Sequence, residues 1–237
     1  MVTGRDVLFA NPDLAVCRVA ATTTSGLYRD ALGDELVYVQ SGAAVLESVF
    51  GNLAVSDGDY VVIPRSTTHR WVIPDGQMLH ALVLEAVGHV SVPEKYLTGR
   101  GQLREGAPFS ERDLRVPEEP IGVPPEGPVA VTVRTRSGWS RHCHVDHPFD
   151  VDSDEVLFYS AGDFMSRRGA GIAAASITLH PAGFVHGPQP GSVEASVQAS
   201  RTEETAVMID TFAPLEISSS ARAAADPDYP WSWARRP

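Results

Sequence analysis

Apolar residues along this chain recur in short runs, and each run is bounded by glycine, proline, aspartate or serine. The runs are β-branched or alternate apolar and polar positions, which is typical of strands rather than helices. Turn signals separate them at intervals of about ten residues, a spacing typical of a sandwich or a barrel. The pattern predicts an all-β chain with strands at 14–21, 35–40, 43–50, 60–64, 69–74, 79–87, 129–136, 155–160, 176–181, 193–199 and 205–212.

A region rich in proline, glycine and charge separates two groups of predicted strands. It covers residues 98–128 and is typical of a linker that runs over a surface. We therefore expect an N-terminal domain at 1–97 and a C-terminal domain at 129–215, followed by a tail at 216–237. We expect the tail to dock against the protein, because it contains three aromatic residues, Tyr229, Trp231 and Trp233.

The two strand-rich halves repeat the same pattern of residues. A glutamate opens a strand and a glycine follows after six further residues; later comes a proline with a histidine five positions on. The residues are Glu35, Gly42, Pro64 and His69 in the first half, and Glu155, Gly162, Pro181 and His186 in the second. A repeat of this kind predicts two domains of the same architecture.

The second half also carries residues that favour a metal site. His142 and His144 would point to one face of a strand, and His147 follows them closely. Together with Glu155 and His186 they offer up to three imidazoles and a carboxylate, ligands that suit iron, manganese, nickel or zinc. The first half has no histidine pair before its glutamate, so we expect it to be metal-free.

Structural interpretations of the same residues remain open. The three histidines of 142–147 fit a solvated loop cluster, Glu155 an exposed strand start, and His186 a turn cap. His180 fits a packed histidine or one that supports a metal ligand. Four apolar residues after the glutamate fit the domain core or the lining of a substrate pocket: Phe158, Tyr159, Phe164 and Met165.

Composition narrows the choice of partners and location. The formal charge of −11 disfavours nucleic acid and anionic membranes as partners. The sequence shows no transmembrane run and no signal peptide, and its two cysteines do not form a disulfide framework. We therefore expect a cytoplasmic protein.

The repeated motifs resemble those of the cupin superfamily, which implies a bicupin, two jelly-roll β-barrels in one chain. A narrower resemblance is to the homogentisate 1,2-dioxygenases, which covers most of the chain. The matching runs are GDYVVIPRSTTHRW (58–71), KYLTGRGQLREGAPFSERDL (95–114), HPFD (147–150), VDSDEVLFYSAGDFMSRRG (151–169), SITLHPAGFVHGPQPGSVEAS (176–196), ETAVMIDTF (204–212) and YPWSW (229–233).

This resemblance implies an iron(II) ring-opening dioxygenase with iron held in the C-terminal barrel by two histidines and a glutamate. Glu155 and His186 match family ligands, and His180 matches an active-site histidine near the substrate. The family's block between HPFD and VDSDEV, which carries the first histidine ligand and an acid–base histidine, is missing here, as is its N-terminal extension. Either a histidine of 142–147 takes the vacant ligand position, or the chain lacks a block of the whole molecule.

The leading hypothesis is a non-haem dioxygenase that uses iron(II), or else manganese, nickel or zinc, to combine O₂ with a small dihydroxyaromatic substrate. The expected metal ligands are His142, His144, Glu155 and His186, and the expected proton-transfer residues are His180 and His147. Two alternatives are a metal-dependent isomerase or lyase that does not use O₂, and a non-enzymatic bicupin that binds a small ligand. Since cupin barrels often pair, the resemblance also implies a homo-oligomer.

Overall fold

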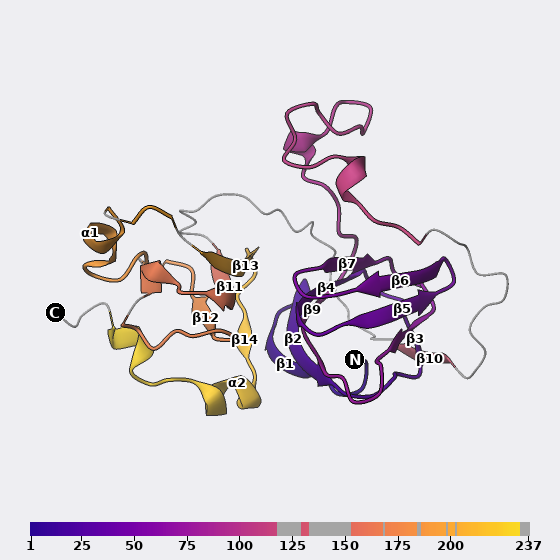
Figure 1. Ribbon diagram of the computed structural model, residues 1–237, viewed down its shortest axis with the longest axis horizontal. Coiled ribbons are helices and arrows are strands. Elements are labelled where there is room, and N and C mark those ends of the chain that lie inside the picture. The colour runs from indigo at the N-terminus through magenta and orange to yellow at the C-terminus, as the bar shows by residue number, and fades with distance from the viewer. Residues whose placement is uncertain are drawn as a thin grey trace. The chain divides into compact units, whose positions relative to one another are not determined.

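The structure, a computed structural model, describes residues 1–117, 129–132, 153–167, 169–183, 186–197, 199–201 and 203–232. Strands dominate it (Figure 1), and the prediction of an all-β fold is confirmed. The strands are β1 (Asp6–Ala10), β2 (Leu14–Ala21), β3 (Leu27–Asp30), β4 (Glu35–Ser41), β5 (Ala44–Ser48), β6 (Gly51–Val55), β7 (Tyr60–Ile63), β8 (His69–Val72), β9 (Leu79–Ala86), β10 (Val129–Thr132), β11 (Asp154–Gly162), β12 (Ile177–His180), β13 (Glu204–Thr211) and β14 (Glu216–Ile217).

Helical segments in the described residues are short. The α-helices are α1 (Ser192–Ser196) and α2 (Ser219–Ala224), and the 3₁₀ turns are η1 (Glu94–Tyr96), η2 (Glu111–Asp113), η3 (Met165–Arg167) and η4 (Tyr229–Trp231). None of the helices in the described part of the chain is long and apolar enough to cross a membrane.

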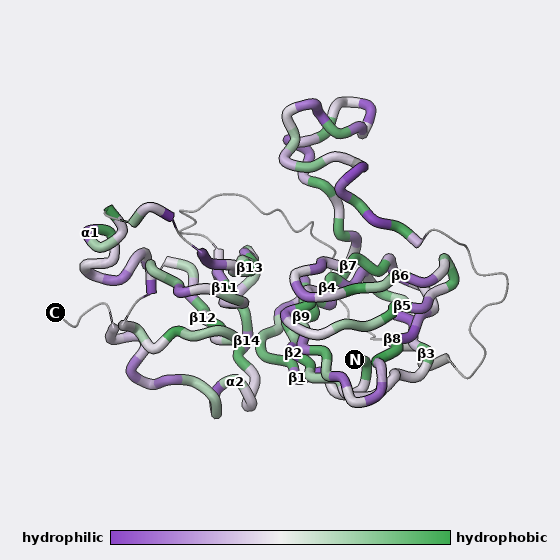
Figure 2. Tube along the Cα trace, in the orientation of Figure 1, coloured by the Kyte–Doolittle hydropathy of each residue, from purple (hydrophilic) through white to green (hydrophobic). Residues whose placement is uncertain are grey.

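The chain divides into two compact units, Met1–Cys143 and His144–Pro237. In the first unit, the strand orders β1-β2-β9-β4-β7 and β10-β3-β8-β5-β6 form two sheets. Alternate residues of both sheets point into one hydrophobic core, which includes the fully buried Val37, Val83 and Trp71. Figure 2 shows the matching hydrophobic stretches along these strands.

β10 lies within the segment expected to begin the second domain, and it pairs in parallel with β3 of the first unit. The described sheet of the second unit has the order β12-β11-β13. Leu157, Tyr159 and Phe164 form a core cluster there, with Ile172 packed against it. Tyr159 and Phe164 thus serve the core, as one of the two interpretations of these aromatic residues expected.

The predicted strand at 193–199 is wrong, because α1 begins there, at Ser192. The alternation of VEASVQA suggested a strand, but Val193 and Val197 are 56% and 73% exposed and have no buried face to line. The run expected at 43–50 ends at Ser48, where the chain turns into β6. β1, β3, β6 and β14 were not predicted as separate strands.

The two units share a trio of strands with the same register. In the first unit, Glu35 of β4 lies opposite Ile63 of β7 and Glu85 of β9. In the second unit, Glu155 of β11 occupies the same central position. Its cross-strand neighbours are His180 of β12 and Asp210 of β13. Residues directly opposite one another share a face of the sheet, so each unit places an acidic pair side by side.

The aspartate before each glutamate has the same role in both units. It is buried, and it accepts hydrogen bonds from two backbone N–H groups. One N–H belongs to the residue just after the proline of the repeat, and the other lies a few residues beyond the last strand of the trio, β9 or β13. The groups are Asp34 with Arg65 and Val90, and Asp154 with Ala182 and Leu215, at 2.7 or 2.8 Å. Because the proline begins the loop that leads to the motif histidine, this aspartate fixes that loop to the glutamate's strand.

The glycine of each repeat is required by its backbone. Gly42 and Gly162 have φ angles of +97° and +118°, a region that side chains disfavour. A Cβ atom added at Gly42 would lie 2.2 Å from the carbonyl oxygen of Met78, and one added at Gly162 would lie 2.1 Å from the carbonyl oxygen of Glu203. The repeat therefore preserves a close approach of two backbones.

We expect Gly42→Ala and Gly162→Ala each to lower the free energy of unfolding by about 2 to 4 kcal/mol, through backbone strain plus steric overlap. Gly58→Ala is the control, since Gly58 also has a positive φ, +84°, but open space around it. We expect a cost of only about 1 kcal/mol there. Urea denaturation measures all three, and equal effects at Gly42 and Gly58 would contradict the overlap.

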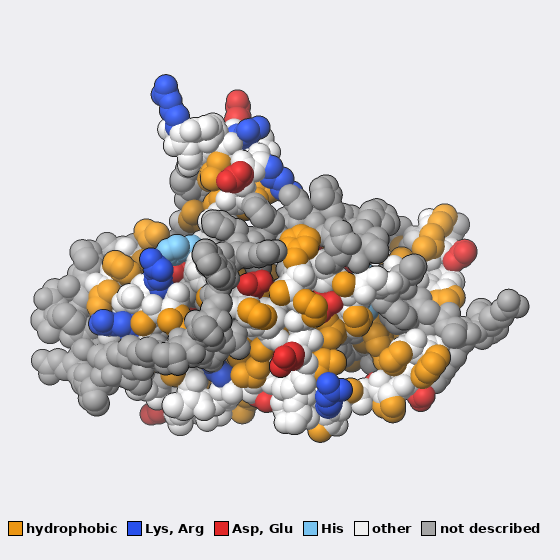
Figure 3. Space-filling view, turned by 180° about the vertical axis from the view of Figure 1, so that it is seen from behind, with side chains coloured by type: hydrophobic (Ala, Val, Ile, Leu, Met, Phe, Trp, Pro, Cys, Tyr) orange, Lys and Arg blue, Asp and Glu red, His pale blue; other side chains and the backbone are white. Residues whose placement is uncertain are grey.

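On the face shown in Figure 3, the coloured Lys and Arg side chains lie scattered among acidic and hydrophobic ones. The whole chain carries a net charge of −11, so its acidic residues outnumber its basic ones. The described residues of this face therefore form no single basic patch.

Candidate metal centre

Glu155 is the second residue of β11, the central strand of the second sheet. His180 ends β12 directly opposite it, and His186 arrives on the loop that follows β12. The side chains of Glu155, His180 and His186 are 12%, 2% and 21% exposed, so the group lies in a largely buried setting. The sheet register and one loop thus gather three residues that can bind a metal.

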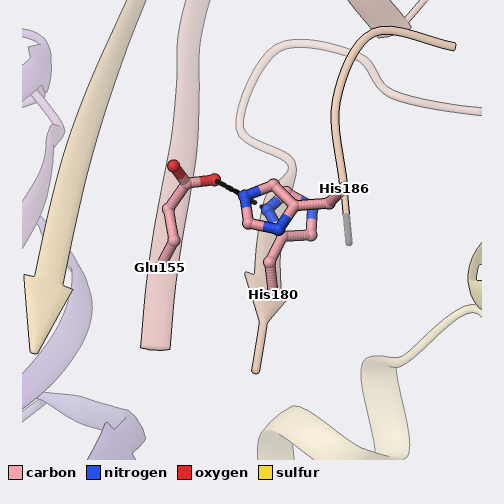
Figure 4. A group of neighbouring side chains, drawn as sticks. All are labelled: Glu155, His180 and His186. Carbon is pink, nitrogen blue, oxygen red and sulfur yellow. Dashed lines mark hydrogen bonds and ion pairs between the residues drawn. The ribbon is translucent and has the colours of Figure 1, made fainter. Parts of the chain in front are cut away.

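The imidazoles of His180 and His186 both contact one oxygen of the Glu155 carboxylate (Figure 4). Oε1 of Glu155 lies 2.8 Å from Nδ1 of His180 and 3.2 Å from Nε2 of His186. The two imidazole rings stack with centroids 4.4 Å apart and planes inclined at 20°. One ligand atom from each residue lies within 4.8 Å of the others, which allows a common ion. Two imidazoles and a carboxylate are the donor set of many non-haem iron sites.

The loop that carries His186 is held from both sides. Before it, the N–H of Ala182 donates to Asp154, the residue next to Glu155. After it, the guanidinium of Arg167 donates to the carbonyl oxygen of Gly187. Arg167 is 6% exposed, and its Nε donates to the Tyr159 hydroxyl at 2.9 Å. Arg167 is therefore a buried anchor for this loop rather than a solvated side chain.

Charge within the group favours an ionised glutamate and a neutral His180. Burial alone would raise the pKa of Glu155, but the hydrogen bond with His180 and the charges of His186, His180 and Arg167 hold it below its usual range. Burial lowers the pKa of His180, and the hydrogen bond to Glu155 only partly opposes this. At neutral pH the pair is thus a carboxylate beside an uncharged imidazole.

These protonation states fix the direction of a hydrogen-bond chain. An ionised carboxylate only accepts, so Nδ1 of His180 carries the hydrogen and donates to Glu155. Nε2 is then an acceptor, and the Tyr229 hydroxyl, 3.2 Å away, donates to it. Burial and the neighbouring Tyr159 raise the pKa of Tyr229 to about 12, so the hydroxyl keeps its proton.

We expect Tyr229→Phe to raise the pKa of His180 by up to about one unit, since the lost hydrogen bond, worth about 0.5 to 1.5 kcal/mol, favours the neutral ring. An NMR titration of the histidine ring in the metal-free protein measures the change. Tyr60→Phe is the control, because Tyr60 lies in the other unit and is 54% exposed. An unchanged pKa in Tyr229→Phe would contradict the derived tautomer.

The structure brings together Glu155, His186 and His180, whereas His142, His144 and His147 lie outside the described residues. Three residues that support the site were not predicted to do so. The tail with Tyr229 was expected only to dock, and Asp210 had no motif of its own. The sequence favoured a solvated pair for Arg167 and Arg168, or a site for a substrate carboxylate, and the solvated interpretation is wrong for Arg167, which is 6% exposed. Asp210 is 6% exposed and lies opposite Glu155 in the register. The sequence signal that could have identified it is an acidic residue inside the apolar run of the last core strand.

The structure gathers Glu155, His180 and His186 on an all-β fold, and comparison with known proteins gives the family. A protein of Saccharolobus solfataricus named "Putative dioxygenase SSO1533" is 30% identical over 298 aligned positions, covering 97% of this chain and 76% of that protein. The chain belongs to the family of this protein. The aligned positions outnumber the 237 residues of this chain, so the relative contains residues with no counterpart here.

Solved cupin structures resemble part of the chain. A cupin-2 domain protein of Shewanella frigidimarina is 17% identical, with 36% of this chain and 82% of that chain covered and a TM-score of 0.33. The cupin domain of Schizosaccharomyces pombe Cnp3 is 10% identical, with coverages of 35% and 63% and a TM-score of 0.34. No family model matches the chain.

Proposed function

We propose that this protein is a non-haem iron(II) dioxygenase that opens the ring of a small dihydroxyaromatic compound, as homogentisate 1,2-dioxygenases do. The observation that carries the proposal is the convergence of Glu155, His180 and His186 on one oxygen atom. The family of a protein named as a dioxygenase and the resemblance to homogentisate dioxygenases point to the same chemistry.

Glu155 and His186 are the proposed metal ligands. Their donor atoms fit a divalent ion, because the carboxylate is ionised and the stacked rings direct nitrogen atoms toward it. A bound iron(II) would supply a Lewis acid and a meeting point for substrate oxygens and O₂. A histidine of the 142–147 segment remains the predicted further ligand, and manganese, nickel and zinc are the alternative metals.

His180 has the proposed role of holding a substrate proton. Its neutral state at working pH makes it a base, and Tyr229 and Glu155 fix both ring nitrogens. If a substrate hydroxyl replaces the Tyr229 contact at Nε2, this nitrogen can accept the phenolic proton. The charge that develops on the imidazole is then stabilised by the Glu155 carboxylate at 2.8 Å. His147 is the second proposed proton-transfer residue.

We further propose that the two units are two cupin barrels. The repeated motif, the matching strand trio and the paired roles of Asp34 and Asp154 support this organisation. In this account the second unit carries the reaction and the first supports it.

The test of the function is oxygen uptake by protein reconstituted anaerobically with iron(II). With homogentisate, gentisate or catechol as substrate, we expect consumption of O₂ in proportion to ring-opened product, followed by ultraviolet absorbance. His180→Gln should retain iron and lower the rate by about 100-fold or more, as expected for loss of a general base. Absence of uptake with every dihydroxyaromatic, despite bound iron, would contradict the proposal; turnover without O₂ would favour an isomerase or lyase.

A further inference from the structure

Arg5 forms a buried ion-pair network in the first unit. Its Nη2 lies 2.9 Å from Oε2 of Glu35, and its Nη1 lies 3.1 Å from Oε1 of Glu35 and 2.8 Å from Oε1 of Glu85. The side chains of Arg5, Glu35 and Glu85 are 6%, 1% and 11% exposed. The guanidinium thus bridges two carboxylates that have little access to water.

The position of this network matches that of the candidate metal centre in the second unit. Glu35 is the repeat counterpart of Glu155, and the two are the first residue of β4 and the second residue of β11, the central strands of their trios. Glu85 lies opposite Glu35 in the register, as Asp210 lies opposite Glu155. The sequence repeat therefore places two acidic residues at one location in each unit.

His69, the repeat counterpart of His186, lies beside the same network and is 1% exposed. Its ring meets Tyr28 edge to face at 5.6 Å, and the Arg5 guanidinium carbon lies 5.6 Å from the centre of that same tyrosine ring. Nδ1 of His69 is 3.0 Å from the Thr67 carbonyl oxygen, whereas its buried Nε2 has no hydrogen-bond partner among the described residues. A buried nitrogen without a partner is costly unless the site can offer it a ligand.

Two buried carboxylates are stable only beside a positive charge. Burial would lower the pKa of Arg5, but Glu35 and Glu85 raise it well above its ordinary value, so the guanidinium is permanently charged. Its planar fork matches a carboxylate in a way that an ammonium group does not. Arg5 thereby meets the electrostatic need that an ion would otherwise meet at this place.

We propose that the guanidinium of Arg5 keeps metal out of the first unit, because it occupies, between Glu35 and Glu85 and near His69, the position that corresponds to the candidate metal centre of the second unit. Carboxylate oxygens and an imidazole nitrogen are suitable zinc ligands once the guanidinium is removed. Arg5 is then the residue that keeps metal out of the first unit, and one arginine decides how many metal ions the chain binds.

The test uses the full chain carrying Glu155→Ala and His186→Ala, so that a metal in the second unit does not contribute to the result. We add Arg5→Ala or, as the control, Arg5→Lys, which keeps a positive charge. Each protein is stripped with a chelator and refolded with and without Zn²⁺. Bound zinc is measured by elemental analysis, and the melting temperature is measured by circular dichroism.

The proposal predicts a single equivalent of zinc and a zinc-dependent rise in melting temperature for Arg5→Ala, with neither effect in the parent or in Arg5→Lys. Adding Glu85→Gln to Arg5→Ala should weaken zinc binding about tenfold or more, as loss of a ligand requires. Three results would overturn the proposal: zinc binding by the parent, no zinc binding by Arg5→Ala, whether folded or unfolded, and zinc binding that Glu85→Gln leaves unchanged. None of them depends on the dioxygenase proposal.

Discussion

Replacing Glu155 with alanine is expected to remove tight binding of a divalent metal, lowering affinity for iron(II) by more than about 100-fold. The physical reason is that Oε1 of Glu155 is the atom on which His180 and His186 both converge, at 2.8 and 3.2 Å. Without the carboxylate, the metal loses its negatively charged ligand, and His186 is the one proposed ligand left among the described residues. Elemental analysis of anaerobically loaded and dialysed protein measures the loss.

Three further variants make this prediction specific. His186→Ala should lose metal to a similar extent, and His180→Gln should retain it, because His180 has the proposed role of holding a proton. Glu203→Ala is the matched control, since its side chain is 68% exposed and pairs with Arg201 at the surface. Stoichiometric metal in Glu155→Ala, or equal loss in Glu203→Ala, would contradict the assignment.

Asp154→Ala is expected to lower the free energy of unfolding of the second unit by about 3 to 5 kcal/mol. The buried carboxylate accepts from the backbone N–H groups of Ala182 and Leu215, and both donors lose a charged partner when it is removed. The binding of metal should weaken as well, because Ala182 lies near the start of the loop that positions His186. Denaturation followed by the fluorescence of tryptophan, together with iron content, measures both consequences.

Glu204→Ala, on the exposed edge of the same sheet, should change stability by no more than about 0.5 kcal/mol. Asp34→Ala should reproduce the large loss in the first unit without a loss of metal, since Asp34 makes the corresponding contacts there. A small effect in Asp154→Ala would show that the loop is fixed by other contacts, Arg167 above all.

Much of the fold was predictable because its signals are local. Alternation and turn residues predicted most strands within one or two residues, and the repeat located the glutamate, glycine and histidine of each unit. The structure explains why those positions repeat: Gly162 permits a close backbone approach, and Glu155 lies at the start of a central strand, as its second residue. The helix α1 was missed because VEASVQA alternates in composition while most of its side chains remain exposed.

The rest of the site could not be predicted, because its parts meet only through tertiary structure. Asp210 reaches the face of Glu155 through the register of β11 with β13, which no local pattern encodes. Tyr229 lies 49 residues from His180 along the chain, so the predicted docking of the tail did not identify its contact. Arg5 stands in a short stretch with no motif, yet it closes the ion-pair network of the first unit.

The most direct measurement is anomalous X-ray diffraction from crystals loaded anaerobically with iron(II). The account predicts one strong peak in the second unit, within about 2.0 to 2.2 Å of a Glu155 carboxylate oxygen and a His186 ring nitrogen, the usual lengths of such metal bonds. It predicts none between Glu35 and Glu85, where Arg5 lies. A peak bonded to neither Glu155 nor His186, or no peak in protein shown to be folded and iron-loaded, would contradict it.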